Sequence, residues 1–247
     1  MATVTERAAP GDLHPLTPEL WEVVARRRMT GDVTDLLLRC PGGRSFDFRP
    51  GQFNMLTALG VGEVPISISS SPGGPVVHHT VRDVGAVTHA LCAARVGSVL
   101  GVRGPFGTHW GANALAGSDV VVIAGGIGLA PLRGAIEQLA TPGPGSARRL
   151  TVLVGARSPG QIVFADDLER WRRRGAAVEV TVDIADGGWR GRVGLVTALL
   201  DSATLDPSAV TALVCGPEVM MRFTIRALMD LGVPGRRILL SLERNMQ

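Results

Sequence analysis

A glycine-rich turn between an apolar run and a helix-compatible segment is the feature that most restricts the fold of this 247-residue chain. The apolar run covers residues 120–124, the turn reads Gly125-Gly126-Ile127-Gly128-Leu129-Ala130-Pro131, and the helix-compatible segment covers residues 132–140. A strand, a glycine turn and a helix in this order direct backbone N–H groups at a pyrophosphate. We therefore predict a dinucleotide site at Gly125, Gly126, Gly128 and Pro131, in which glycines permit close backbone approach and the proline enters the first helical turn.

The pattern of apolar runs changes near residue 112. Before it lie short β-type runs separated by turn residues, over 32–39, 51–56, 65–69, 76–81 and 98–102. They predict an antiparallel barrel or sandwich. After residue 117, strand-like and helix-like segments alternate, over 120–124, 132–139, 150–155, 164–173, 178–183, 194–200, 209–215 and 217–231. This alternation predicts an α/β domain with a parallel sheet. We expect a flexible N-terminal tail over residues 1–18, a β-barrel over 19–112 and the α/β domain over 113–247.

Composition and charge exclude several classes of protein. The net charge is only +3 and all 25 basic residues are arginine, without the aromatic interleaving of a nucleic-acid binder. Residues 1–15 lack the apolar core of a signal peptide, and the uncharged apolar stretch 120–132 is too short and too glycine-rich to span a bilayer. We therefore expect a cytoplasmic protein with no membrane insertion and no nucleic-acid partner. The three cysteines are far apart and odd in number, which argues against a disulfide framework and against a four-cysteine metal or iron-sulfur site in this chain, and we predict no metal-binding residues.

Seven motifs in order resemble the ferredoxin-NADP reductase superfamily. They are Arg49-Pro50-Gly51-Gln52-Phe53, Pro65-Ile66-Ser67, Gly85-x-Val87-Thr88, Gly104-Pro105-Phe106-Gly107, the glycine turn, Gly155-Ala156-Arg157 and Cys215-Gly216-Pro217. The match runs from about Trp21 to the end. It is most similar to the gamma (diaphorase) subunit of cytoplasmic NAD(P)-linked nickel-iron hydrogenases, or sulfhydrogenases, and to the electron-transfer subunit of dihydroorotate dehydrogenase. The Val-Pro-Ile-Ser-Ile-Ser form and the ending Ser241-Leu242-Glu243-Arg244 favour the hydrogenase subunit. The resemblance implies a flavin-binding Greek-key barrel followed by an NAD(P)-binding α/β domain.

The resemblance places a flavin on the barrel. Family members usually read Arg-x-Tyr-Ser at the flavin, and the aligned residues here are Val64, Pro65, Ile66 and Ser67. Ser67 is the predicted catalytic residue, because its hydroxyl can donate a hydrogen bond to flavin N5; the alternative is a strand-end hydroxyl bonded to backbone. With no arginine in the motif, Arg82 is the candidate for the flavin phosphates. Residues predicted to border the ribityl chain or the ring are His79, Thr80 and Val81, without a proton-transfer role for the histidine.

A helix is expected to begin after Gly85. Gly85, Val87 and Thr88 would then bring the helix N-terminus to the flavin diphosphate. A simple N-cap at this point is compatible with that role. Gly104 to Gly107 is predicted to form a tight turn at the domain junction.

The second half of the chain carries the nicotinamide nucleotide by the same resemblance. No carboxylate stands at the end of the predicted strand at Arg157, and an arginine there suits a 2′-phosphate, which favours NADPH over NADH; a solvated turn is the alternative. Cys215, Gly216 and Pro217 face the nicotinamide in relatives, with Cys215 as a packing residue and not a nucleophile. Glu243 belongs to a segment that borders the flavin in relatives, or it is a surface carboxylate.

The predicted activity is hydride transfer between NAD(P)H and FAD. The chain has neither the tyrosine nor the lysine of a short-chain dehydrogenase, and transfer between two bound cofactors needs no general acid. We expect an NAD(P)H-dependent flavin oxidoreductase that exchanges single electrons with an iron-sulfur subunit, in a nickel-iron hydrogenase complex. Related subunits continue with a cysteine-rich [2Fe-2S] segment, which is absent from this sequence. Either the chain is truncated before that segment or the electrons leave by another route. The alternatives are the same role in dihydroorotate dehydrogenase or an oxygenase, and a non-catalytic flavin- or nucleotide-binding regulatory subunit.

Overall fold

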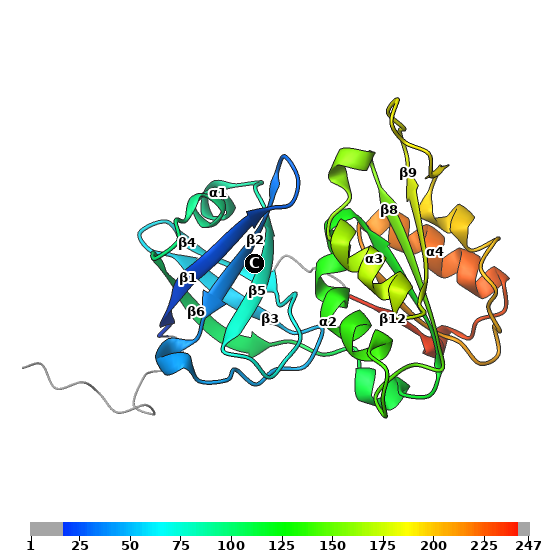
Figure 1. Cartoon of the computed structure of the whole chain (residues 1–247), viewed down its shortest axis with the longest axis horizontal. Helices are drawn as coiled ribbons and strands as arrows, with labels where there is room; N and C mark the ends of the chain where they lie inside the picture. Colours follow the sequence, from blue (N-terminus) through cyan, green and yellow to red (C-terminus); the bar gives the residue numbers. More distant parts are fainter. Residues whose placement is uncertain (1–16, 242–247) are drawn as a thin grey trace, which may run out of the picture.

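The computed structural model describes residues 17–241. It has two halves, a closed β-structure and an α/β sandwich, that lie side by side (Figure 1). Helix α2 lies at the side of the sandwich that faces the barrel. Both predicted fold classes are confirmed.

The first half is an antiparallel six-stranded barrel. Its strands are β1 (Glu19–Arg28), β2 (Val33–Arg39), β3 (Phe53–Ala58), β4 (Gly62–Ser67), β5 (Val76–Arg82) and β6 (Val99–Phe106), in the spatial order β4-β3-β6-β1-β2-β5. An antiparallel bridge between Ile68 and His79 joins the end of β4 to β5 and closes the barrel. Helix α1 (Ala86–Ala93) packs on it through Leu91 and Cys92. Buried residues alternate with half-buried ones along β3, as expected for a strand whose two faces differ in burial.

The second half is a parallel sheet with helices on both faces. Its strands are β7 (Asp119–Gly125), β8 (Arg149–Ala156), β9 (Ala177–Val182), β10 (Arg192–Val193), β11 (Thr211–Cys215) and β12 (Ile238–Leu240), in the order β10-β9-β8-β7-β11-β12. Its helices are α2 (Leu129–Ala140), α3 (Ala165–Arg173) and α4 (Glu218–Asp230). Short 3-10 helices are η1 (Pro41–Gly43), η2 (Ala112–Leu115), η3 (Gly126–Gly128), η4 (Pro159–Gln161), η5 (Val196–Leu199) and η6 (Gly235–Arg237).

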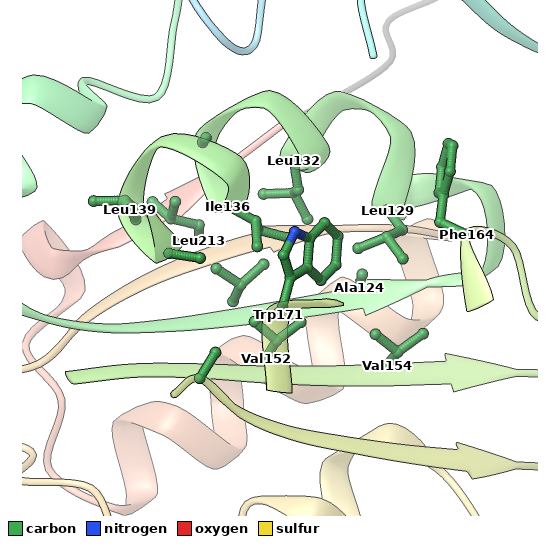
Figure 2. Close-up of a cluster of buried hydrophobic side chains, with 14 of the residues drawn as sticks. Ala124, Leu129, Leu132, Ile136, Leu139, Val152, Val154, Phe164, Trp171 and Leu213 are labelled. Atoms are coloured by element: carbon green, nitrogen blue, oxygen red, sulfur yellow. The ribbon is translucent and has the colours of Figure 1, made fainter. Parts of the chain in front are cut away.

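Strand β7 is apolar throughout its centre because both of its faces are covered. Val120 and Val122 face one side, where α2 and α3 pack, whereas Val121 and Ile123 face the side of α4 and η5. Figure 2 shows the first of these layers, with Trp171 of α3 inserted between α2 and the sheet. The period-two alternation of apolar residues thus fills two separate cores from one strand.

Three details differ from the sequence-based expectations. Strand β1 was not predicted as a run of its own, because its sequence ELWEVVARRR presents charges on its exposed face. The turn predicted over residues 104–107 was wrong, since β6 continues to Phe106 and pairs with Phe53. The short edge strands β10 and β12 were also not recognised as strands, since two or three residues carry too little periodicity.

Candidate functional site

The glycine turn packs directly against the end of β11. A Cβ atom on Gly128 would lie 2.6 Å from the carbonyl oxygen of Cys215, and one on Gly125 would lie 3.0 Å from Cδ of Pro217. Gly126 has φ +54°, a conformation that side chains disfavour. Pro131 occupies the first turn of α2, where a missing N–H leaves no hydrogen bond unmade. The turn therefore has the backbone geometry of a phosphate-binding loop.

This turn lines a cavity of about 550 Å³ that reaches both halves of the protein. Its wall combines Arg82 from the barrel, the glycine turn and the segment Cys215–Pro217. Helix α4 adds one face to it, namely Glu218, Met221, Arg222 and Ile225. The volume suits a small ligand or part of a dinucleotide. Predicted residues from distant parts of the sequence thus meet at one site.

The residues on α4 were missed by the sequence analysis. Their spacing at i, i+3, i+4 and i+7 marks one helix face, and it directly follows the Cys-Gly-Pro motif. That combination is the signal that would have placed them in the cavity.

Arg82 supplies positive charge where the halves meet. Its Nε atom is buried and lies 3.3 Å from Oδ2 of Asp32, yet it makes no directed hydrogen bond with any described residue. The side chain is 38% exposed, and its Nη2 atom lies 3.6 Å from where a Cβ of Gly126 would be. Thr30 donates a hydrogen bond to the other Asp32 oxygen at 2.8 Å. An incompletely satisfied guanidinium beside a phosphate-binding loop fits an anionic ligand.

The four residues of the predicted flavin motif lie on β4 and alternate in exposure. Val64 and Ile66 are half-buried and pack against the barrel core, whereas Pro65 is exposed. The half-buried Ser67 ends the strand, and its hydroxyl makes no hydrogen bond within residues 17–241. Ser67 thus has a hydroxyl available to a ligand, and its role towards flavin N5 stays a prediction.

Three further residues of the predicted flavin site lie on β5. His79, Thr80 and Val81 are all buried, and the side chain of Val81 packs in the barrel core. The Nδ1 atom of His79 lies 3.2 Å from the carbonyl oxygen of Ser67, and Thr80 donates a 3.0 Å hydrogen bond to Asp35. Burial lowers the pKa of His79 to about 4, which keeps the ring neutral.

Helix α1 begins where the sequence predicted, and its start is capped. The Thr88 hydroxyl accepts the Gly85 N–H at 2.9 Å and donates to the Gly85 carbonyl at 3.0 Å. Val87 is half-buried against the barrel core. The N-cap residue of α1 is thus Gly85, and Thr88 is the third helical residue, whose hydroxyl satisfies the Gly85 N–H. The proposed contact with a diphosphate stays a prediction.

The remaining predicted residues lie at the carboxyl ends of the parallel strands. Arg157 follows β8 as an exposed side chain, without an ion pair to any residue in the described part of the chain. Cys215 ends β11 with 4% exposure, and Gly216 and Pro217 lead into α4. Glu243 lies outside the described residues.

Two further searches bear on cofactors and location. Between residues 17 and 241 there is no group of three or more His, Cys, Asp or Glu side chains arranged to hold a metal ion. No helix in that range has the length and apolar character needed to cross a lipid bilayer.

Comparisons with known proteins agree with this geometry. The family described as "Oxidoreductase NAD-binding domain" matches residues 122–226. Sulfhydrogenase 2 subunit gamma of Pyrococcus furiosus is 32% identical over 216 residues, which cover 82% of this chain and 74% of that protein. The "Probable dihydroorotate dehydrogenase B (NAD(+)), electron transfer subunit" of Methanocaldococcus jannaschii is 31% identical over 204 residues, or 83% of this chain and 71% of that protein.

A solved structure shows the same fold. The flavohem-like FAD/NAD-binding domain of nitric oxide dioxygenase from Vibrio cholerae O1 biovar El Tor superposes with a TM-score of 0.79 at 20% identity, covering 91% of this chain and 98% of that domain. Fold and site together define a two-domain, nucleotide-binding oxidoreductase. The chain belongs to the ferredoxin-NADP reductase superfamily of NAD(P)-binding flavin oxidoreductases. The family resemblance seen in the sequence is confirmed.

Proposed function

We propose that this protein binds FAD on its barrel and transfers a hydride between NAD(P)H and that flavin. The observation that carries the proposal is the cavity that Arg82 of the barrel shares with the glycine turn and Cys215–Pro217. A nicotinamide that enters this cavity from the α/β side would meet a ligand held by the barrel. Hydride transfer needs such a meeting, with the reacting atoms about 3–3.5 Å apart.

Each element of the site has a distinct proposed task. The glycine turn and the start of α2 bind the nucleotide pyrophosphate, while Gly216 leaves room for the nicotinamide ring. On the barrel, Arg82 offsets phosphate charge and the Ser67 hydroxyl donates to the flavin ring. A bound flavin would accept the hydride from nicotinamide C4 at its N5 and release the two electrons singly. The protein binds and orients both ligands and supplies no proton.

We propose NADPH as the preferred nucleotide. Arg157 supports this preference, since its exposed guanidinium has no carboxylate partner among the described residues and no acidic side chain stands at the end of β8. An arginine at this position suits the charge of a 2′-phosphate.

We propose an iron-sulfur protein as the electron partner, in a nickel-iron hydrogenase complex. The 32% identity with a sulfhydrogenase gamma subunit supports this partner. The 31% identity with a dihydroorotate dehydrogenase electron-transfer subunit favours a second candidate almost equally. Affinity purification from the native cell separates them, because the first partner brings nickel with it and the second brings dihydroorotate-dependent reduction of the flavin.

An anaerobic spectral titration tests the proposed chemistry. The purified chain is loaded with FAD, and the flavin band at about 450 nm is followed while NADPH or NADH is added. One equivalent of NADPH is expected to bleach the band faster than NADH does. A chain that takes up no FAD, or whose FAD neither nucleotide reduces, would refute the proposed function.

A further inference from the structure

Arg133 on α2 is fixed by three groups from two parts of the molecule. Its Nη1 atom donates a 2.7 Å hydrogen bond to the carbonyl oxygen of Ser69, which belongs to the barrel. Its Nε atom binds the carboxylate of Asp167 on α3, and its guanidinium carbon lies 4.9 Å from the ring centroid of Phe164. The side chain is only 14% exposed. A guanidinium that donates hydrogen bonds from two of its nitrogens and has an aromatic ring over its face has little freedom to move.

The barrel end of this contact is itself rigid. Ser69 donates its N–H to the carbonyl of His78 at 2.9 Å, and its hydroxyl lies 2.9 Å from the hydroxyl of Thr80. Ser69 follows Ser67 by two residues in the segment that extends β4. A displacement of Ser69 would therefore carry Ser67 with it.

The other end of the contact lies close to the nucleotide loop. Arg133 is five residues beyond Gly128, on the helix that begins directly after the glycine turn. Its neighbour Gly134 touches the barrel as well, because a Cβ there would lie 2.6 Å from the carbonyl oxygen of Ser70. The two proposed ligand sites are thus joined through a short and stiff path.

Backbone strain occurs at the third partner of Arg133. Phe164 is the one residue other than glycine with positive φ within residues 17–241, at +57°. An aromatic residue rarely adopts this conformation, and strained residues persist where the surroundings require them. Here the strained residue stands at the start of α3, so that its ring and the nearby Asp167 both meet Arg133.

We propose that Arg133 is a positioning residue for hydride transfer: it fixes the Ser67–Ser70 segment of the barrel relative to the glycine turn, and so sets the approach of nicotinamide to flavin. The inference rests on the proposed function. Arg133 belongs to neither proposed ligand site, and it acts through Ser69. Because a misplacement of about 1 Å can slow a positioned reaction about 100-fold, loss of this contact affects the rate of transfer more than ligand affinity.

Two substitutions disturb the contact in different ways, and a third serves as control. Arg133→Met removes the donors and keeps the alkyl chain. Gly134→Ala keeps the Arg133 side chain and pushes a methyl group at the Ser70 carbonyl, next to the Ser69 carbonyl that Arg133 binds. Arg170→Met is the control, because Arg170 also pairs with Asp167, at 2.7 Å, but its ion pairs are all within the α/β half.

Stopped-flow reduction of the FAD-loaded variants separates rate from affinity. With Arg133→Met and Gly134→Ala, the limiting reduction rate at saturating NADPH is expected to fall about 10- to 100-fold, while the dissociation constants of FAD and NADPH stay within about twofold. Arg170→Met is expected to lower the melting temperature and to keep the limiting rate. An equal rate in all four proteins, or a loss confined to nucleotide affinity, would overturn the inference.

A distance measurement tests the contact without any turnover. Nitroxide labels at Val96→Cys on the barrel and Met229→Cys on α4 use two exposed positions, and the native cysteines are buried. The distance distribution is expected to broaden or shift with Arg133→Met and Gly134→Ala, and to stay unchanged with Arg170→Met. If the parent protein shows no reduction at all, the proposed function fails and this measurement still decides whether Arg133 fixes the two halves. Unchanged distributions in the first two variants would refute the positioning role.

Discussion

His79 lies wholly inside the barrel, and both of its ring nitrogens are used. Since the Ser67 carbonyl can only accept, Nδ1 carries the proton, and Nε2 accepts from the Asn54 amide at 3.2 Å. The pKa of about 4 agrees with this neutral tautomer. Protonation would keep the Nδ1–H bond to the Ser67 carbonyl, but it would bury a charge and turn Nε2 into a donor that faces the Asn54 N–H.

This burial predicts acid sensitivity in a defined range of pH. An unfolded histidine titrates at about 6.5, so between pH 6.5 and 4 the unfolded chain binds a proton that the folded chain does not. Stability therefore rises with pH through this range, and from pH 5 to 7 the free energy of unfolding should gain about 2 kcal/mol from His79. Asp35 and Glu137, whose pKa values are lowered, contribute at more acidic pH.

Urea denaturation at pH 5 and pH 7 measures this effect. The double variant His79→Leu with Asn54→Val removes the pair without leaving an unpaired amide. Between pH 5 and pH 7, its free energy of unfolding should rise by about 2 kcal/mol less than that of the wild type. His89→Gln, which changes an exposed histidine, should keep the wild-type profile. Parallel profiles for wild type and the double variant would contradict the role of His79.

Arg157 is the residue on which the nucleotide preference depends. Arg157→Gln should raise the KM for NADPH about tenfold or more and leave that for NADH within about twofold, because a charge-assisted hydrogen bond contributes about 1.5–3 kcal/mol. Arg173→Gln, an exposed arginine at the far end of α3, is the matched control. Equal changes for both nucleotides would place Arg157 outside the 2′-phosphate site.

At the scale of elements, the glycine turn is the most restricted part of the site. Gly128→Ala would place a methyl group against the Cys215 carbonyl, so the turn must move away from β11. We expect a loss of stability of about 1–3 kcal/mol and weaker nucleotide binding. The control is Gly160→Ala, whose added Cβ meets no atom within 4 Å. Calorimetric binding of NADP⁺ and thermal melting compare the two, and similar behaviour would show that close packing of the turn is unimportant.

Elements with strong local patterns were predictable from the sequence, and long-range contacts were not. The apolar run of β7 predicted the parallel sheet, and the glycines that follow it predicted the nucleotide loop. The residues from Gly85 onward predicted α1. Each of these patterns depends only on residues that are neighbours in the sequence. The contact of Arg133 with Ser69 joins residues 64 positions apart and has no local signature. The same holds for the hydrogen bond between His79 and Asn54, because nothing in the sequence around either residue indicates that the two side chains are buried together.

At the scale of the molecule, the two halves share a core. Val33 of the barrel belongs to the apolar cluster formed by α2, α3 and one face of the parallel sheet, and Met29 packs against it. Trp110 joins the same cluster with 5% exposure. Its backbone N–H donates to the Pro50 carbonyl of the barrel half at 2.9 Å, and its indole N–H donates to the Pro131 carbonyl of α2 at 2.8 Å. The domain boundary near residue 112 stays a prediction, and it falls beside this shared packing.

We therefore expect the halves to unfold together and to separate when the shared packing is removed. Calorimetry of the wild-type protein should give one transition, because unfolding of either half exposes apolar surface of the other. Trp110→Ala should cost about 3–5 kcal/mol and split the transition in two. Trp189→Ala is the matched control, since that indole lies in the connection from β9 to β10 and donates to the nearby Arg192 carbonyl. Two transitions in the wild type, or one in the Trp110 variant, would mean that the halves are energetically independent or joined by other contacts. In either case the contacts of Trp110 would not determine how the two proposed ligand sites are placed relative to each other.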